Sequence, residues 1–291
     1  MPIAVILLAV ASATAFVVLA PTAKPFADVL KNYRSSELVL LDRDNQVLQE
    51  SRQLNAVRRL PWTPLEQIPN DLKTLLVQAE DRRFYGHGGV DVLAFANAGW
   101  NWLRGNSSRG ASTISMQVTE LVARGGRGGE RRNWRQKINQ MQAAIGLEKS
   151  WSKDQILEAY VNLLYFRGEL QGIAAAAQGL FGKAPFGLND WESASIVALI
   201  RAPNASAQKV LQRACRMLSG AGTSCKPPEQ MVQQLTSSYR IKSLERLAPH
   251  IARHLGEAKQ SGRLITSLQR GLQIRVQEIL KAQVEKLREQ N

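Results

Sequence analysis

The 291-residue sequence is poor in the side chains that most often bind transition metals. It has three histidines and two cysteines, and no Cys-x-x-Cys pair. A structural or catalytic zinc ion needs three or four such ligands held together, so the composition argues against a zinc protein. The cysteines, Cys215 and Cys225, could close a small loop in an oxidising compartment and would be ordinary thiols in the cytoplasm.

Acidic residues are also in deficit. Lysine and arginine total 38 against 24 aspartates and glutamates, which gives a formal net charge of +14. Such an excess favours polyanionic partners: nucleic acid, anionic lipid headgroups or a phosphorylated substrate. The hydrophobic content of 44% is ample for a packed core and excludes a disordered chain.

Charged side chains are absent from residues 2–22. About 20 apolar residues suffice to cross a bilayer, so we predict a membrane anchor over residues 1–22. The alternative is a cleaved signal peptide, although the apolar run is longer than such peptides usually have. Small residues suited to a cleavage site are Ala11, Ala13 and Ala15. Basic residues lie after this segment but none lies before it, which by the positive-inside rule favours a cytoplasmic location for the chain beyond residue 22.

The remaining pattern predicts a mostly α-helical protein with one short β-hairpin over residues 36–52, turning at Asp42–Gln46. Helical periodicity begins after Asn70, a candidate cap, and the glycines Gly86–Gly89 are expected to stop that helix. Two capping boxes predict further helix starts, Ser152 with Gln155 and Asn189 with Glu192. We divide the chain into an anchor or signal (1–22), a linker with the hairpin (23–60), a helical domain (61–245) and a helical connector (246–291).

Glu80 is the sharpest catalytic candidate. It is expected at the C-terminal end of a helix and beside an apolar stripe, where the helix dipole and partial desolvation both disfavour the charged carboxylate. Such an environment produces a general base or acid that works at neutral pH. The alternative interpretation is a surface ion-pair network, because Glu80 and Asp81 are followed directly by two arginines.

Two segments are suited to anions. "GASTISMQ" (110–117) combines a glycine with three hydroxyls, as a helix start that binds an anion does, although an ordinary helix start has the same composition. "RGGRGGERRNWRQK" (124–137) holds five arginines and one lysine against one glutamate. We expect a basic loop that leads into a helix, either a solvated charged loop or one that gathers phosphate groups.

Five blocks in order resemble glycosyltransferase family 51, the peptidoglycan polymerases of bacterial cell walls. They are EDRRFYGHGGVD, GASTISMQ, KINQMQAAIGLEKSWSKDQILEAYVN, LQGIAAAAQGLFGK and ESASIVALIRAPN. "LLDRDNQVL" and "RRLPWTPL" upstream resemble the penicillin-binding protein 1C branch of class A penicillin-binding proteins, so the resemblance covers about residues 36–205. "LITSLQRGLQIRVQEIL" is similar to the connector that leads to a transpeptidase in that family.

The resemblance implies a lysozyme-like, mostly helical glycosyltransferase domain on the outer face of the cytoplasmic membrane, held by a single-pass anchor. The implied substrates are lipid II and the growing glycan chain. Membrane lipid and other cell-wall synthesis proteins are the implied partners, and nucleic acid is not expected. The implied reaction forms a β-1,4 bond with inversion and releases undecaprenyl pyrophosphate.

Residue by residue, the resemblance makes Glu80 the general base that deprotonates the acceptor 4-hydroxyl. Gln140 stands at the position of a second catalytic acid that helps the pyrophosphate leave. The implied substrate-binding residues are Asp81, His87, Ser112, Thr113, Gln117, Arg135 and Lys137. Asp81 and His87 are equally suited to packing, and three further matches, Glu148, Glu158 and Asn162, are equally explained by capping and helix packing.

Three positions depart from the family pattern. Glu120 stands where a lysine or arginine is usual, Gln136 replaces an arginine and Gln140 replaces the second glutamate. An amide can donate a hydrogen bond to phosphate but does not bind a divalent cation as a carboxylate does. Gln140 therefore disfavours a divalent cation, which is the one cofactor that stays open, and we expect Arg135 to supply the guanidinium missing at Gln136.

Transpeptidase motifs are missing as well. "SWSK" (150–153) has the Ser-x-x-Lys spacing of the first motif, but the later motifs do not occur, so no penicillin binding is expected. Three other functions stay open at this point. A non-catalytic lipid II scaffold is favoured by the three departures, and nucleic-acid binding is favoured by the charge alone. A lytic transglycosylase would share the fold and the glutamate, but not the pyrophosphate-suited blocks.

Overall fold

The computed structural model describes residues 14–52, 57–104, 112–124, 133–219, 225–236, 246–257 and 262–289. The described chain is mostly α-helical, as predicted. Its helices are α2 (Phe26–Asn32), α3 (Asn70–Glu80), α4 (Val92–Leu103), α5 (Ile114–Arg124), α6 (Trp134–Ser150), α7 (Lys153–Leu163), α8 (Ile173–Phe181), α9 (Asp190–Ile200), α10 (Ala207–Ser219), α11 (Glu229–Thr236), α12 (Pro249–Glu257) and α13 (Arg270–Glu289). Short 3-10 turns are η1 (Leu65–Gln67), η2 (Phe84–Gly86) and η3 (Pro185–Gly187), and the strands are β1 (Glu37–Leu41), β2 (Val47–Arg52), β3 (Arg58–Arg59), β4 (Tyr165–Arg167), β5 (Leu170–Gln171) and β6 (Gly262–Ile265).

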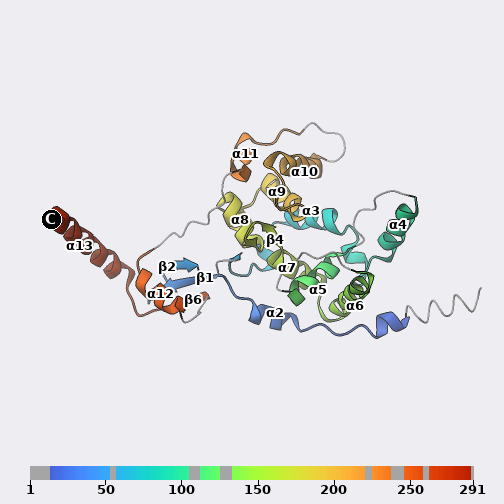
Figure 1. Ribbon diagram of the computed structural model, residues 1–291, viewed down its shortest axis with the longest axis horizontal. Helices are drawn as coiled ribbons and strands as arrows, with labels where there is room; N and C mark the ends of the chain where they lie inside the picture. The colour runs from blue at the N-terminus through green and yellow to red at the C-terminus, as the bar shows by residue number, and fades with distance from the viewer. Residues whose placement is uncertain are drawn as a thin grey trace, which may run out of the picture.

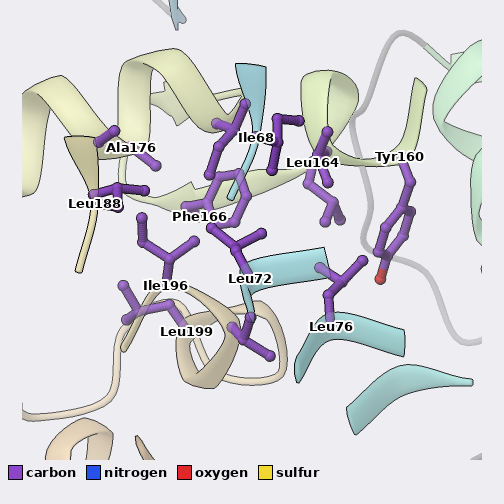
Figure 2. Packing of buried hydrophobic residues seen from close by; sticks show 14 of the residues in the cluster. Ile68, Leu72, Leu76, Tyr160, Leu164, Phe166, Ala176, Leu188, Ile196 and Leu199 are labelled. Carbon is purple, nitrogen blue, oxygen red and sulfur yellow. The ribbon is translucent and has the colours of Figure 1, made fainter. Parts of the chain in front are cut away.

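The main core lies where α3, α7, α8 and α9 meet around strand β4 (Figure 2). Leu72 and Leu76 of α3 are fully buried in it, one helical turn apart. Tyr160 of α7 and Phe166 of β4 are among the largest side chains packed there without exposure. The buried stripe of α3 therefore fixes the direction of that helix, and with it the place of Glu80, its last residue.

Both predicted capping boxes are confirmed. The side chains of Ser152 and Asn189 accept hydrogen bonds from the third residue of α7 and α9, and the residues there, Gln155 and Glu192, return a bond to the caps. The predicted cap at Asn70 is wrong, because Pro69 occupies the N-cap position and makes no side-chain bond. The glycines do not end this helix either: it ends at Glu80, ahead of them.

The predicted hairpin is confirmed as β1 and β2, which pair antiparallel. The sequence did not predict that β6 adds to β1 as a parallel third strand. Helix α12 packs on this sheet, and the two form a second, small core of Leu38, Leu40, Leu48, Ala248 and Ala252. Figure 1 shows this unit to one side of the helical domain, with the predicted C-terminal helix, α13, extending beyond it. A second sheet, in the order β3-β5-β4, lies in the helical domain.

The segment before α2 runs along α6 (Figure 1). A side chain at Gly146 of α6 would meet the carbonyl oxygen of Pro21 at 1.7 Å, so this close approach requires glycine. Trp151 donates a hydrogen bond from Nε1 to the Lys24 carbonyl at 2.8 Å. The predicted anchor, residues 1–22, lies mostly outside the described residues. Among the helices that the structure describes, none is both long and apolar enough to cross a bilayer.

Cys215 and Cys225 form a disulfide at the end of α10. Of the two states that the sequence left open, the structure has the oxidised one.

Candidate active site

Glu80 ends α3, as predicted, and its side chain is only 9% exposed. Arg201, which follows α9 as its C-cap, places Nε 2.8 Å from Oε1 of Glu80. The same guanidinium donates through Nη2 to the carbonyl oxygen of Ala79. The candidate base is thus a nearly buried carboxylate paired with one cation from another helix.

Asp81 and His87 are brought together directly behind Glu80. His87 Nε2 lies 3.0 Å from both carboxylate oxygens of Asp81. The backbone N–H of Gly89 donates to His87 Nδ1 at 3.2 Å, which makes Nδ1 an acceptor and assigns the ring proton to Nε2. Asp81 also accepts the backbone N–H of Ile114 at 2.9 Å. These bonds connect the turn after α3 to the start of α5 and leave Asp81 and His87 in a supporting position.

The first turn of α5 holds the predicted hydroxyl and amide residues. Thr113 donates to the carbonyl of Gly89 at 2.6 Å and accepts the N–H of Met116 at 3.2 Å, as an N-cap residue does. Gln117 accepts a hydrogen bond from Tyr160 at 3.0 Å. Both side chains therefore hold the site together. Ser112 lies just before the helix, and its hydroxyl accepts a hydrogen bond from the ammonium of Lys137 at 2.6 Å.

The phenol of Tyr160 stays protonated. Burial, and in second place the negative charge of Glu80, raise the pKa of Tyr160 well above its ordinary value. Tyr160 is therefore a fixed hydrogen-bond donor to Gln117 and is unsuited to act as a base near neutral pH.

Lys137 and Gln140 lie next to each other on α6. The ammonium of Lys137 is 3.4 Å from Oε1 of Gln140, and Nε2 of Gln140 donates to the carbonyl of Met116 at 2.7 Å. The amide of Gln140 thus joins α6 to α5, and its oxygen faces a positive charge. These residues do not fit a divalent cation, because the position offers no carboxylate and already lies against an ammonium. No group of three metal-ligating side chains is present in the part of the chain that the structure describes.

Arg135 is not brought into this cluster. It is exposed, and its guanidinium lies 5.4 Å from the centroid of the Trp134 ring. Gln136 is engaged in the capping box at the start of α6, with Asn133. We predicted that Arg135 supplies the guanidinium missing at Gln136. Among the described residues, its side chain contacts Trp134 and is not hydrogen-bonded to Lys137 or Gln140. The basic loop before α6 lies largely outside the described residues, from 125 to 132.

The three further polar matches act within the framework. Glu158 accepts hydrogen bonds from Trp62 Nε1 and from the backbone of Leu65. Asn162 exchanges two hydrogen bonds with the backbone of Thr63. Both side chains of α7 thus fasten the segment before α3. Glu148 in turn receives bonds from the buried Ser115 and from Lys153.

Sequence reasoning missed Arg201 as a member of the site. It was part of the fifth block, ESASIVALIRAPN, but had no role assigned. Its place in the fifth block, directly after a helix whose residues 192–199 are all buried, had no pattern that pointed to Glu80.

Sequence comparison identifies the family. Residues 44–221 match the profile of the transglycosylase family. Penicillin-binding protein 1A of Neisseria flavescens is 35% identical over 183 residues, which cover 62% of this chain and 22% of the relative. A protein of Cupriavidus necator named as a transglycosylase is 36% identical over 163 residues, or 56% of this chain and 69% of that protein. The chain thus spans about a fifth of the penicillin-binding protein relative.

A crystal structure of penicillin-binding protein 1A from Haemophilus influenzae aligns with 82% of this chain and 28% of its own, at a TM-score of 0.35 and 17% identity. A similarity at this level carries no argument about the fold. The lysozyme-like arrangement and the 1C branch both stay predictions.

Proposed function

Because the chain belongs to the transglycosylase family, we propose that it is a peptidoglycan glycosyltransferase that polymerises lipid II into β-1,4-linked glycan strands. One observation carries the proposal: the start of α5 is bonded to Asp81, the residue next to the nearly buried carboxylate Glu80, and Ser112 at the same helix start holds the ammonium of Lys137. The first group suits proton removal and the second suits an anionic leaving group.

In the proposed reaction, Glu80 removes the proton from the 4-hydroxyl of the acceptor lipid II. The oxygen attacks C1 of the growing chain from the face opposite the pyrophosphate, and the C1–O bond to the pyrophosphate breaks. An α-linked donor therefore becomes a β-1,4 bond. Lys137 and Ser112 hydrogen-bond to the oxygens that take up the negative charge as undecaprenyl pyrophosphate leaves.

The membrane is the proposed location, with the enzyme on the periplasmic or outer face. The uncharged residues 2–22 support an anchor. Helix α4 supports contact with a lipid-linked substrate, because it exposes several large apolar side chains: Val92, Leu93, Phe95 and Trp100. An exposed apolar group of this kind is typical of a surface that meets lipid or another apolar partner.

A second candidate is a lipid II-binding scaffold without turnover. Gln140 favours it, since an amide replaces the expected acid. Incubation of the full chain with lipid II distinguishes the two. The proposed enzyme forms glycan polymer and releases undecaprenyl pyrophosphate, whereas saturable binding without either product supports the scaffold.

Lys137→Gln is expected to lower kcat/KM for lipid II by about 10- to 100-fold. It removes a charge-assisted hydrogen bond to the leaving group, and such a bond is worth about 1.5–3 kcal/mol. The matched control is Arg135→Gln, which removes one positive charge two residues away on the same helix. Because Arg135 is exposed beside Trp134, this variant should stay within about threefold of wild type. Equal losses in both variants would assign the effect to net charge and contradict a specific role for Lys137.

A further inference from the structure

Arg201 makes a two-point contact with the last turn of α3. Its Nε donates to Oε1 of Glu80 at 2.8 Å, and its Nη2 donates to the carbonyl of Ala79. The two partners differ in exposure: the side chain of Arg201 is 53% exposed and that of Glu80 only 9%. The guanidinium therefore covers a carboxylate that is otherwise enclosed by protein.

We propose that Arg201 is a positioning residue for Glu80, which fixes one carboxylate oxygen and leaves the other to take the proton of the acceptor hydroxyl. The proposal rests on the proposed glycosyl transfer. Among the described residues, no hydrogen bond reaches Oε2 of Glu80. The planar guanidinium restricts rotation of the carboxylate because it is itself held by the Ala79 carbonyl.

The other polar groups near Glu80 have partners of their own among the described residues. Asp81 is paired with His87, and Tyr160 of α7 is protonated and neutral. Arg201, from the end of α9, is the cation in contact with the carboxylate. Arg201 is therefore the group that can hold the Glu80 carboxylate in one orientation.

The test compares wild type, Arg201→Gln and Arg201→Lys, each as the full 291-residue chain, in lipid II polymerisation. Arg201→Gln should lower kcat by about tenfold or more, because the carboxylate loses its alignment, with KM within about threefold. Arg201→Lys keeps a cation that can contact one carboxylate oxygen but not the planar two-point geometry, so it should restore part of kcat and not all of it.

Arg213→Gln is the matched control. Arg213 on α10 also approaches α9, through the carbonyl of Ala198 at 3.5 Å, and makes no contact with Glu80. Its kcat and KM should equal those of wild type. A folded Arg201→Gln variant with the wild-type kcat overturns the positioning role and leaves the glycosyl transfer standing. A wild-type protein that forms no polymer overturns both.

Discussion

Glu80→Gln is expected to reduce polymerisation of lipid II by about 10²- to 10⁴-fold, which is the range that general acid–base catalysis contributes. Glutamine keeps the size of the side chain and can still contact Arg201, but it cannot accept the proton of the acceptor hydroxyl. Binding of lipid II should change little. The measurement is the initial rate of polymer formation, with circular dichroism and thermal unfolding to show that the variant is folded.

The control for Glu80→Gln is Glu66→Gln. Glu66 lies in η1, shortly before α3, and is exposed to solvent. The same chemical change there should leave the rate within about twofold of wild type, as expected for a surface substitution away from the site. Undiminished polymerisation by folded Glu80→Gln would contradict the assignment of Glu80 as the base.

Gly89→Ala is expected to destabilise the protein by about 3 kcal/mol and to abolish most activity. The backbone at Gly89 has φ +101°, which a residue with a side chain adopts at a cost of about 1–3 kcal/mol. An added Cβ would also lie 2.6 Å from the carbonyl oxygen of Ala144, in the backbone of α6. Relief of that contact would separate the turn from α6 and break the bond between Thr113 and the Gly89 carbonyl.

Gly88→Ala separates these causes from a general effect of losing glycine. A Cβ at Gly88 has no heavy atom within 4 Å, and its φ is not positive. Its free energy of unfolding should stay within about 0.5 kcal/mol of wild type in denaturant titrations. Similar losses at Gly88 and Gly89 would contradict the close packing of Gly89 on α6.

The features of the fold that the sequence predicted correctly are those with local signals. In the capping boxes at Ser152 and Asn189 the partners are three residues apart, so the pattern can be read directly. The hairpin, β1 and β2, likewise depends on a short turn. Strand β6 could not be predicted, because it pairs with β1 from more than 200 residues away and has only four residues.

The end of α3 shows why local helix-stop signals can mispredict where a helix ends. The glycines at 86–89 are genuine breakers, yet the helix ends earlier because of a long-range contact. The backbone N–H of Asp81 closes the last turn on Val77, and its carboxylate then accepts the N–H of Ile114 on α5. That contact spans 33 residues and had no sequence pattern of its own.

The sequence predicted several residues of the candidate site but not the contacts between them. Glu80 lies at a helix end, as the sequence predicted, and Lys137 contacts Ser112, another residue that the sequence assigned to the site. The pairing of Glu80 with Arg201 depends on how α3 packs against α9, and no local pattern in either segment specifies that packing. Gln140 had looked like a missing acid, and it proved to hold α6 to the Met116 carbonyl.

The most direct test is to count undecaprenyl pyrophosphate released and new glycosidic bonds formed from lipid II, with wild type and Glu80→Gln assayed side by side. Our account predicts that wild type releases one pyrophosphate for each new bond, that the new bonds are β-linked, and that Glu80→Gln forms almost none while still binding lipid II. A wild-type protein that binds lipid II but releases no pyrophosphate, or a Glu80→Gln variant as fast as wild type, would contradict it.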